Sequence, residues 1–377
     1  MSRHLPGLDL LRAIAIGSVM CFHSFLIGGV NEHLAWVSRF GWMGVDLFFV
    51  LSGFLIGSQV LYPLTHGLPL SLRAFYIRRA FRILPAFWVV LALYVAFPWF
   101  REAPGLEAWW KFATFVVNLS INYVPHQAFS HAWSLCVEEH FYICFPLLAW
   151  ALTGRLSMRA FVSVILALVV LGIALRTTIW LHDHQVARAR NWFVEDLYFP
   201  TWNRLDGLLA GVSLAALKTC RPRQWQAWGA YPNRALLAGI LIVAFATWLF
   251  WNRVGLAANS VGWPVLSLGL ALLVFAGAQR TGVIGRRAVP GAAWIAAVSY
   301  SLYLIHKPIY HIEQALCGEV LRRHGLLAFA SYTAASLLAA AILYYVVERP
   351  SLLLRDRLLG KLQQTRHEAS HVLPLRH

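Results

Sequence analysis

Residues 8–28, LDLLRAIAIGSVMCFHSFLIG, form an apolar segment long enough to cross a lipid bilayer as a helix. Two ionisable residues, Arg12 and His23, interrupt it. At about 100° per residue their side chains fall on nearly the same helix face, roughly 16 Å apart along the axis. Ionisable side chains at membrane depth usually face a protein interior or a water-filled cavity. The spacing therefore favours two polar points on one internal surface, although Arg12 could instead reach lipid phosphate and His23 could be a hydrogen-bonded core residue.

The composition of the 377-residue chain is typical of an integral membrane protein. Hydrophobic residues make up 59% of it and charged residues 13%, whereas soluble domains carry about 25% charged residues. No small-residue cleavage site follows the first apolar segment, so we expect this segment to remain as an anchor. The five cysteines lack the spacing of a zinc site or a disulfide framework.

The net charge of +16 does not indicate a nucleic-acid partner. The basic residues lie in short loops between apolar segments, where they set the topology and contact anionic membrane lipid. Most of the 32 lysines and arginines fall in the loops on the same side as the N-terminus. Because cytoplasmic loops are rich in these residues, we expect both termini to be cytoplasmic.

Apolar segments of spanning length recur along the chain and predict an all-α, polytopic transmembrane helix bundle of about ten spans. The stretch 107–123 is short and amphipathic, and we expect it at the membrane interface. The predicted spans are 8–28, 43–62, 80–100, 132–153, 160–181, 202–218, 235–251, 261–279, 292–316 and 327–347.

The chain is predicted to form a single membrane-embedded domain, residues 1–350, followed by a loose basic cytoplasmic tail, residues 351–377. The tail is polar and too short to fold as a domain. No internal repeat and no second soluble domain is evident in the sequence, so any chemistry is expected to take place inside the bundle.

Polar residues are predicted to converge near the outer ends of several spans. His23, Asp46 and Glu138 each fall within a few residues of an outer helix end, and Arg204 and Asp206 begin the sixth predicted span. We expect them at a similar depth, roughly 5–10 Å below the outer surface. For Asp46 and Asp206 the alternative is stabilisation at helix N-termini by the helix dipole.

A second group of polar residues is expected at the cytoplasmic side. Arg79 and Arg82 are three residues apart on one face of the third span, and Arg12 lies at the same end of the first. Two guanidinium groups on one face suit a polyphosphate ligand, although such arginines also occur as topology signals. In the ninth span, Tyr303 shares a face with His306, which indicates either a functional site or hydrogen bonding between helices.

Seven motifs, in this order, resemble the integral-membrane acyltransferase family 3, whose members O-acylate lipopolysaccharide, exopolysaccharide, peptidoglycan and some small molecules. The resemblance runs from residue 8 to about 350, with two departures: Cys136 and His140 replace the Ser and Gln more usual at these positions. The motifs are LDLLRA, GVDLFFVLSGFLI, RRAFRILP, WSLCVEEHFYICFP, RLDGLLAG, SYSLYLIHKP and the closing Glu-Arg-Pro at 348–350.

The resemblance implies a membrane-bound O-acyltransferase of the bacterial inner membrane. It implies transfer of an acyl group, expected to be acetyl, from cytoplasmic acetyl-CoA to a hydroxyl of a surface polysaccharide or a similar acceptor, without a metal. The alternative is a transporter or flippase of lipid-linked sugar or another small solute, which would use the same buried charges as a substrate pathway.

On this interpretation His23 is the general base, since imidazole is suited to take a hydroxyl proton near neutral pH. An acyl-imidazole on His23 is the covalent variant. Glu138, or failing that Asp46, is predicted to orient the ring, as a carboxylate does in a triad. The residues predicted to bind the donor are Arg12, Arg79 and Arg82, and those predicted to bind the acceptor are Arg204, Asp206, Tyr303 and His306.

Overall fold

The computed structural model describes residues 5–26, 32–152, 157–185, 190–321 and 324–372. Every regular element within these ranges is a helix, and one isolated bridge pairs Leu106 with Ala128. The prediction of an all-α bundle is therefore confirmed. A helix satisfies its backbone hydrogen bonds within one segment, which is the requirement for a chain that crosses hydrocarbon.

Each predicted span corresponds to one long helix in the described residues. Among the residues that the structure describes, seven segments are long and apolar enough to cross a membrane, and α7, α9 and α13 are outside this set. The number of spans and the side of the termini stay predictions. The long helices are α1 Pro6–Leu26, α3 Met43–Thr65, α4 Leu72–Ala96, α7 Trp133–Ala151, α8 Met158–Asp183, α9 Asp206–Cys220, α11 Pro232–Leu249, α12 Trp263–Ala278, α13 Ala292–Leu321 and α14 Gly325–Leu343.

Shorter helices connect and cap the long ones. The predicted interfacial stretch 107–123 contains two of them, α5 and α6. The short helices are α2 Glu32–Ser38, η1 Pro98–Phe100, α5 Trp109–Ala113, α6 Val117–Ser120, η2 Ser130–Ala132, η3 Phe193–Tyr198, η4 Thr201–Asn203, α10 Pro222–Gly229, η5 Ala258–Gly262 and η6 Tyr344–Glu348.

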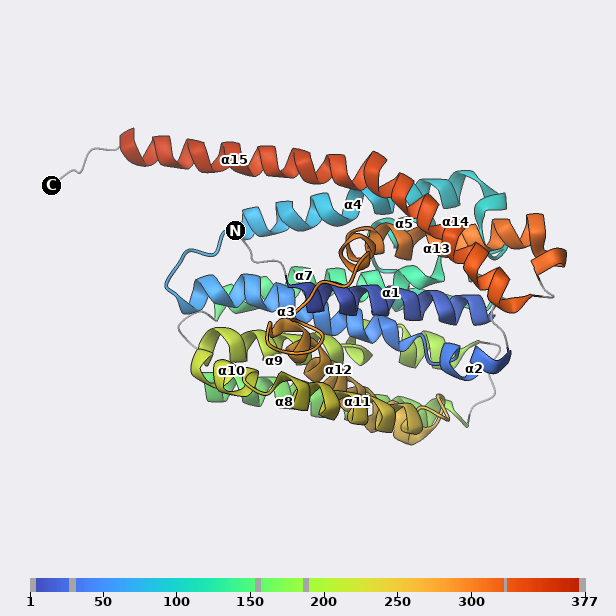
Figure 1. Cartoon of the computed structure of the whole chain (residues 1–377), viewed down its shortest axis with the longest axis horizontal. Helices are drawn as coiled ribbons and strands as arrows, with labels where there is room; N and C mark the ends of the chain where they lie inside the picture. The colour runs from blue at the N-terminus through green and yellow to red at the C-terminus, as the bar shows by residue number, and fades with distance from the viewer. Residues whose placement is uncertain (1–4, 27–31, 153–156, 186–189, 322–323, 373–377) are drawn as a thin grey trace.

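The predicted loose tail is helical as far as the structure describes it. The π-helical turn η6 leads from α14 directly into α15 (Arg349–Val372), which extends along the side of the bundle (Figure 1). α15 begins with RPSLLLRDRLLG, a mixture of leucine and arginine that supports an amphipathic helix. The beginning of α1 and the last turns of α15 lie toward the same end of the molecule (Figure 1).

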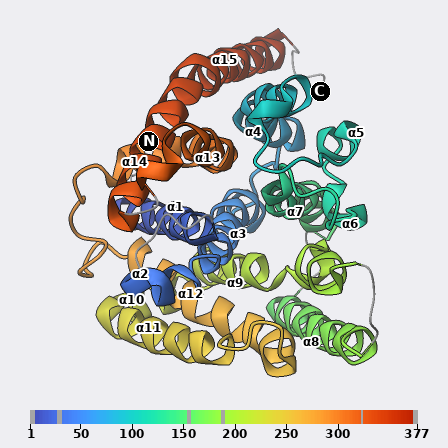
Figure 2. The ribbon, with the colours of Figure 1, turned by 90° about the vertical axis from the view of Figure 1, so that its right-hand side faces the viewer.

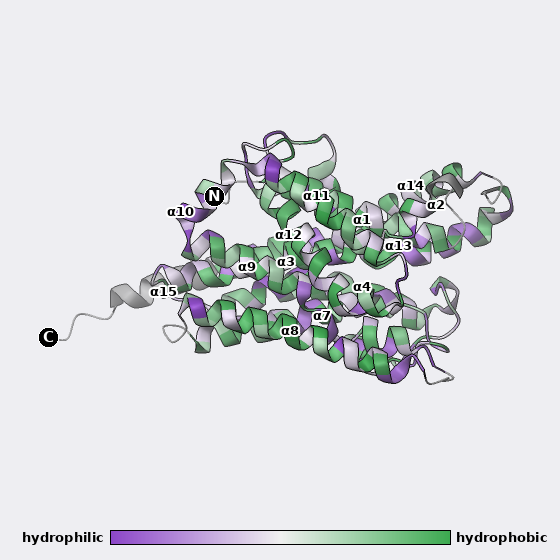
Figure 3. Cartoon of the chain, turned by 90° about the horizontal axis from the view of Figure 1, so that it is seen from below, coloured by the Kyte–Doolittle hydropathy of each residue, from purple (hydrophilic) through white to green (hydrophobic). Residues whose placement is uncertain are grey.

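The long helices pack around a centre formed by α1 and α3. Seen along the bundle, α13 and α14 lie on one side of this centre, and α9, α11 and α12 on the other (Figure 2). α1 contacts α3, α12 and α13. Hydrophobic residues cover most of the helix surface, and hydrophilic residues gather in the connections at the ends (Figure 3).

Glycine allows α3 and α9 to pack closely. A Cβ atom on Gly53 would lie 2.2 Å from the carbonyl oxygen of Leu208, and one on Gly211 would lie 2.2 Å from that of Val50. Small residues let helix backbones approach one another inside a membrane, where van der Waals packing drives association.

Two buried ion pairs support this packing: one joins α3 to the segment that precedes α9, and the other joins α9 to α8. Arg204 Nη2 donates to Asp46 Oδ1 at 2.7 Å, and Arg176 Nη1 donates to Asp206 Oδ2 at 2.8 Å. All four side chains are almost fully buried, and the Arg204 guanidinium carbon also lies 3.6 Å from the centre of the Trp263 ring. Removing one partner of such a pair leaves a buried charge uncompensated, so these residues hold the helices in register.

Candidate functional site

Two cavities inside the bundle meet at Val45 and Tyr303, which belong to the walls of both. We call the first, of about 240 Å³, the arginine pocket; its polar wall consists of Arg12, Ser52, Gln59, Arg79, Arg82, Ser134, Glu138, Glu139, Tyr142, Ser299, Tyr300 and Tyr303. We call the second, of about 310 Å³, the histidine pocket; its polar and aromatic wall consists of Phe22, His23, Trp42, Tyr123, Ser130, His131, Trp133, Phe193, Tyr198, Phe199, Arg253, Tyr303 and Lys307.

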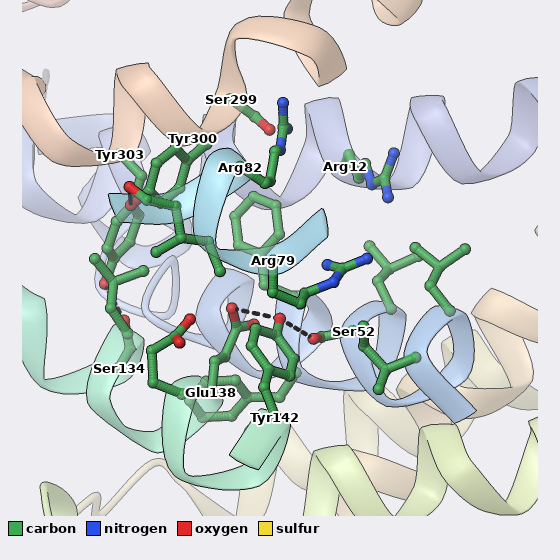
Figure 4. Close-up of a pocket in the computed structure, with 18 of the residues that line it drawn as sticks. Arg12, Ser52, Arg79, Arg82, Ser134, Glu138, Tyr142, Ser299, Tyr300 and Tyr303 are labelled. Carbon is green, nitrogen blue, oxygen red and sulfur yellow. Dashed lines mark hydrogen bonds between the residues drawn. The ribbon is translucent and has the colours of Figure 1, made fainter. Parts of the chain in front are cut away.

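Three guanidinium groups from two helices line the arginine pocket: Arg12 of α1, and Arg79 and Arg82 of α4 (Figure 4). Arg82 forms an ion pair with Glu348, whose second carboxylate oxygen accepts a hydrogen bond from Ser301 Oγ at 2.7 Å. Arg82 is therefore already neutralised by a residue of η6.

Arg79 has weaker partners within the protein. Its Nη2 lies 3.4 Å from Gln59 Oε1, and its guanidinium carbon lies 5.6 Å from the centre of the Tyr142 ring. Its buried Nε has no hydrogen-bond partner among the described residues. A buried donor without a partner carries a desolvation cost that a bound anion would remove, so Arg79 is the wall residue best placed to hold a phosphate.

Glu138 also lies in the arginine pocket. Tyr142 Oη donates to Glu138 Oε2 at 2.9 Å, and Ser52 Oγ shares a hydrogen bond with the same hydroxyl (Figure 4). The expectation that Glu138 orients His23 is not met, because the two residues line different cavities and the Glu138 carboxylate is engaged by its own helix.

The His23 ring contacts His306 of α13 instead. His23 Nδ1 lies 2.7 Å from His306 Nε2, and His306 Nδ1 lies 3.0 Å from the carbonyl oxygen of Tyr303 and 3.1 Å from that of Leu302. A carbonyl oxygen only accepts hydrogen bonds, so His306 Nδ1 carries a proton. In neutral His306 the Nε2 atom is then an acceptor, and His23 Nδ1 must donate to it. This chain of hydrogen bonds leaves the lone pair of His23 on Nε2.

A third histidine completes this group. The His131 ring centre lies 6.3 Å from that of His23 and 5.4 Å from that of His306. Burial lowers the pKa of His131 well below its usual value, and the nearby Lys307 ammonium adds to the effect. Lys307 itself forms an ion pair with Glu102 at 2.8 Å. Within the described residues, no group of histidine, cysteine, aspartate or glutamate side chains is arranged to hold a metal ion.

The structure brings some of the predicted site residues together and separates others. His306 and Tyr303 lie beside His23. Asp46, Arg204 and Asp206 are absent from the walls of both cavities, because each is engaged in a buried ion pair. Asp46 therefore does not orient His23 either. Sequence reasoning missed Ser52, His131, Tyr142, Arg253 and Lys307 as wall residues.

The chain belongs to the family of integral-membrane acyltransferases: residues 5–345, nearly the whole bundle, match the acyltransferase domain. Its apolar helices and bacterial relatives make it an integral protein of the bacterial plasma membrane. It is 26% identical over 335 residues to the peptidoglycan O-acetyltransferase OatA of Listeria monocytogenes, with 81% of this chain and 49% of that protein covered. It is 29% identical over 230 residues to the O-acetyltransferase OatA of Staphylococcus aureus, with 56% and 34% covered. The chain thus spans half or less of the length of these relatives, and no solved structure matches it.

Proposed function

We propose that this protein transfers an acetyl group from cytoplasmic acetyl-CoA to a hydroxyl of a surface carbohydrate. The family and the names of the relatives support O-acetyl transfer to a cell-wall polymer. The observation that carries the proposal is the pair of adjoining cavities, one lined by arginines and the other by a histidine with a defined free lone pair. The first suits the phosphates of a donor, and the second suits an acceptor hydroxyl.

The donor would bind with its phosphates on Arg79 and with Arg12 beside them, while Arg82, paired with Glu348, completes the wall. Glu138 and Glu139 lie in the same wall and offset part of the positive charge. They therefore lower the free-energy cost of burying the guanidinium groups when no ligand is bound. The thioester would reach the histidine pocket past Val45 and Tyr303, where the two cavities meet. This route leaves the face of α1 that carries Arg12 and His23 and passes between α3 and α13.

His23 would act as the general base of the transfer. Its Nε2 takes the proton of the acceptor hydroxyl while the hydroxyl oxygen bonds to the acyl carbonyl carbon. The carbon–sulfur bond then breaks, and the leaving thiolate takes the proton from the imidazolium. His306 holds His23 in the tautomer that this step requires, which is the positioning task of the aspartate in a serine-protease triad.

A transfer assay tests the proposal against transport of a lipid-linked sugar. Protein in nanodiscs is mixed with acetyl-CoA labelled in the acetyl group and with surface glycan extracted from bacterial membranes. We expect the label to move to the glycan with release of one free CoA thiol for each acetyl group. The contradicting result comes from the same protein in sealed vesicles. Accumulation of lipid-linked sugar inside the vesicles, with acetyl-CoA left intact, would identify a transporter instead.

Replacing His306 by phenylalanine is expected to lower the turnover number by about tenfold to a hundredfold. Phenylalanine keeps the ring but removes the acceptor that holds the His23 tautomer, so donor affinity should not change. His306→Gln offers a side-chain carbonyl to His23 and should restore part of the loss. Measuring turnover and the donor KM of all three proteins checks this, and wild-type turnover in the phenylalanine variant would contradict a positioning role.

A further inference from the structure

Arg253 lines the histidine pocket but has no part in the transfer described above. It lies in the loop between α11 and η5, where Asn259 Nδ2 donates to the Arg253 carbonyl oxygen at 2.9 Å. The Trp180 indole donates to the carbonyl oxygen of the next residue, Val254, at 2.6 Å. Because Asn259 is fully buried, the backbone of this loop is held from inside the bundle.

Aromatic rings enclose the guanidinium group of Arg253. Its central carbon lies 4.5 Å from the centre of the Tyr198 ring and 4.6 Å from that of Trp42, with Phe22 and Phe193 further away. Ring faces attract a cation without neutralising it. The rings therefore fix the orientation of the guanidinium group in the pocket wall, near Phe22, the residue that precedes His23. The positive charge of Arg253 stays available to bind an anion.

The charge of Arg253 has no carboxylate of its own. The nearby Asp46 is bound by Arg204 at 2.7 Å, so one carboxylate serves two guanidinium groups. In the part of the chain that the structure describes, no ion pair involves Arg253, and its buried Nε lacks a hydrogen-bond partner. The Tyr198 hydroxyl hydrogen-bonds the guanidinium group but does not neutralise it. A largely buried cation without a carboxylate partner is costly, and a ligand anion would lower that cost.

We propose that Arg253 binds a carboxylate group of the acceptor, so that the histidine pocket selects an acidic sugar. The inference rests on the proposed function, since the acceptor is the hydroxyl-bearing substrate of His23. A guanidinium group presents paired N–H donors that match a carboxylate, and the aromatic wall offers apolar faces to the sugar ring. Binding of the carboxylate at Arg253 would place a ring hydroxyl near His23 Nε2.

Equilibrium dialysis without acyl donor tests this inference, with radiolabelled methyl glucuronide and its uncharged amide as probes. The two probes have the same hydroxyls and differ in charge. We expect wild-type protein in nanodiscs to retain the glucuronide at least about tenfold more strongly than the amide. Arg253→Gln should abolish this preference by weakening glucuronide binding alone. Equal retention of the two probes by the wild type, or retention of neither, would overturn the proposal.

Two variants separate recognition of the anion from damage to the fold. Arg253→Lys keeps the positive charge and should keep part of the preference. Arg39→Gln removes an exposed guanidinium that also lies near a tryptophan, 5.2 Å from the Trp251 ring centre, and should bind both probes as the wild type does. Loss of both probes in Arg253→Gln would indicate a structural role and overturn the proposal. Since no acetyl-CoA is present, this result is independent of whether the protein transfers acetyl groups.

Discussion

Replacing His23 by alanine is expected to abolish acetyl transfer, with turnover at least about a hundredfold below that of the wild type. General-base catalysis contributes about 10²–10⁴-fold to a rate, and the contact with His306 sets the tautomer that leaves the Nε2 lone pair of His23 available. The assay measures release of the CoA thiol together with acetylation of the glycan. Donor affinity should be unchanged, because Arg12, Arg79 and Arg82 line the other cavity.

The matched control for this variant is His66→Ala. His66 is exposed just beyond the end of α3, where it stacks on Tyr62, and it belongs to neither cavity. Its removal should leave turnover and donor affinity at the wild-type level. A His23→Ala protein that binds acetyl-CoA normally and still acetylates the glycan would exclude His23 as the base and as an acyl carrier.

Replacing Arg82 by alanine is expected to destabilise the fold by about 3 kcal/mol. The reason is the partner: the Glu348 side chain is fully buried, and loss of Arg82 would leave its carboxylate with only the Ser301 hydroxyl. Thermal unfolding in detergent measures the loss. The double variant Arg82→Ala, Glu348→Gln removes both charges and should recover most of the stability, as a double-mutant cycle requires of a coupled pair.

Arg79→Ala should behave in the opposite way. Arg79 has no carboxylate ion-pair partner among the described residues, so its loss should leave the melting temperature within a degree or two while weakening donor binding about tenfold or more. Titration of acetyl-CoA against both arginine variants distinguishes the two roles. A destabilised Arg79→Ala protein with wild-type donor affinity would show that Arg79 acts in the fold and not in the site.

The helices and their membrane character follow from local sequence. In lipid, a segment of about 20 apolar residues forms all its backbone hydrogen bonds within itself only as a helix. Each predicted span is accordingly a helix in the structure. Local periodicity also accounts for the hydrogen bond between Tyr142 and Glu138, because residues four apart share one face of a helix. Counting residues from the helix ends placed the arginines of the first and third spans at the same end of the bundle. They line one cavity.

The partners of the charged and histidine side chains depend on how the helices pack. His23 and His306 are 283 residues apart, and no periodicity within either helix predicts their contact. Arg204 and Asp206 are near neighbours in sequence, yet they pair with Asp46 of α3 and Arg176 of α8. Helical periodicity gives the face on which a residue lies but not the helix opposite it. Packing of α1 against α13 therefore determined that the His23 ring contacts His306, and neither Glu138 nor Asp46.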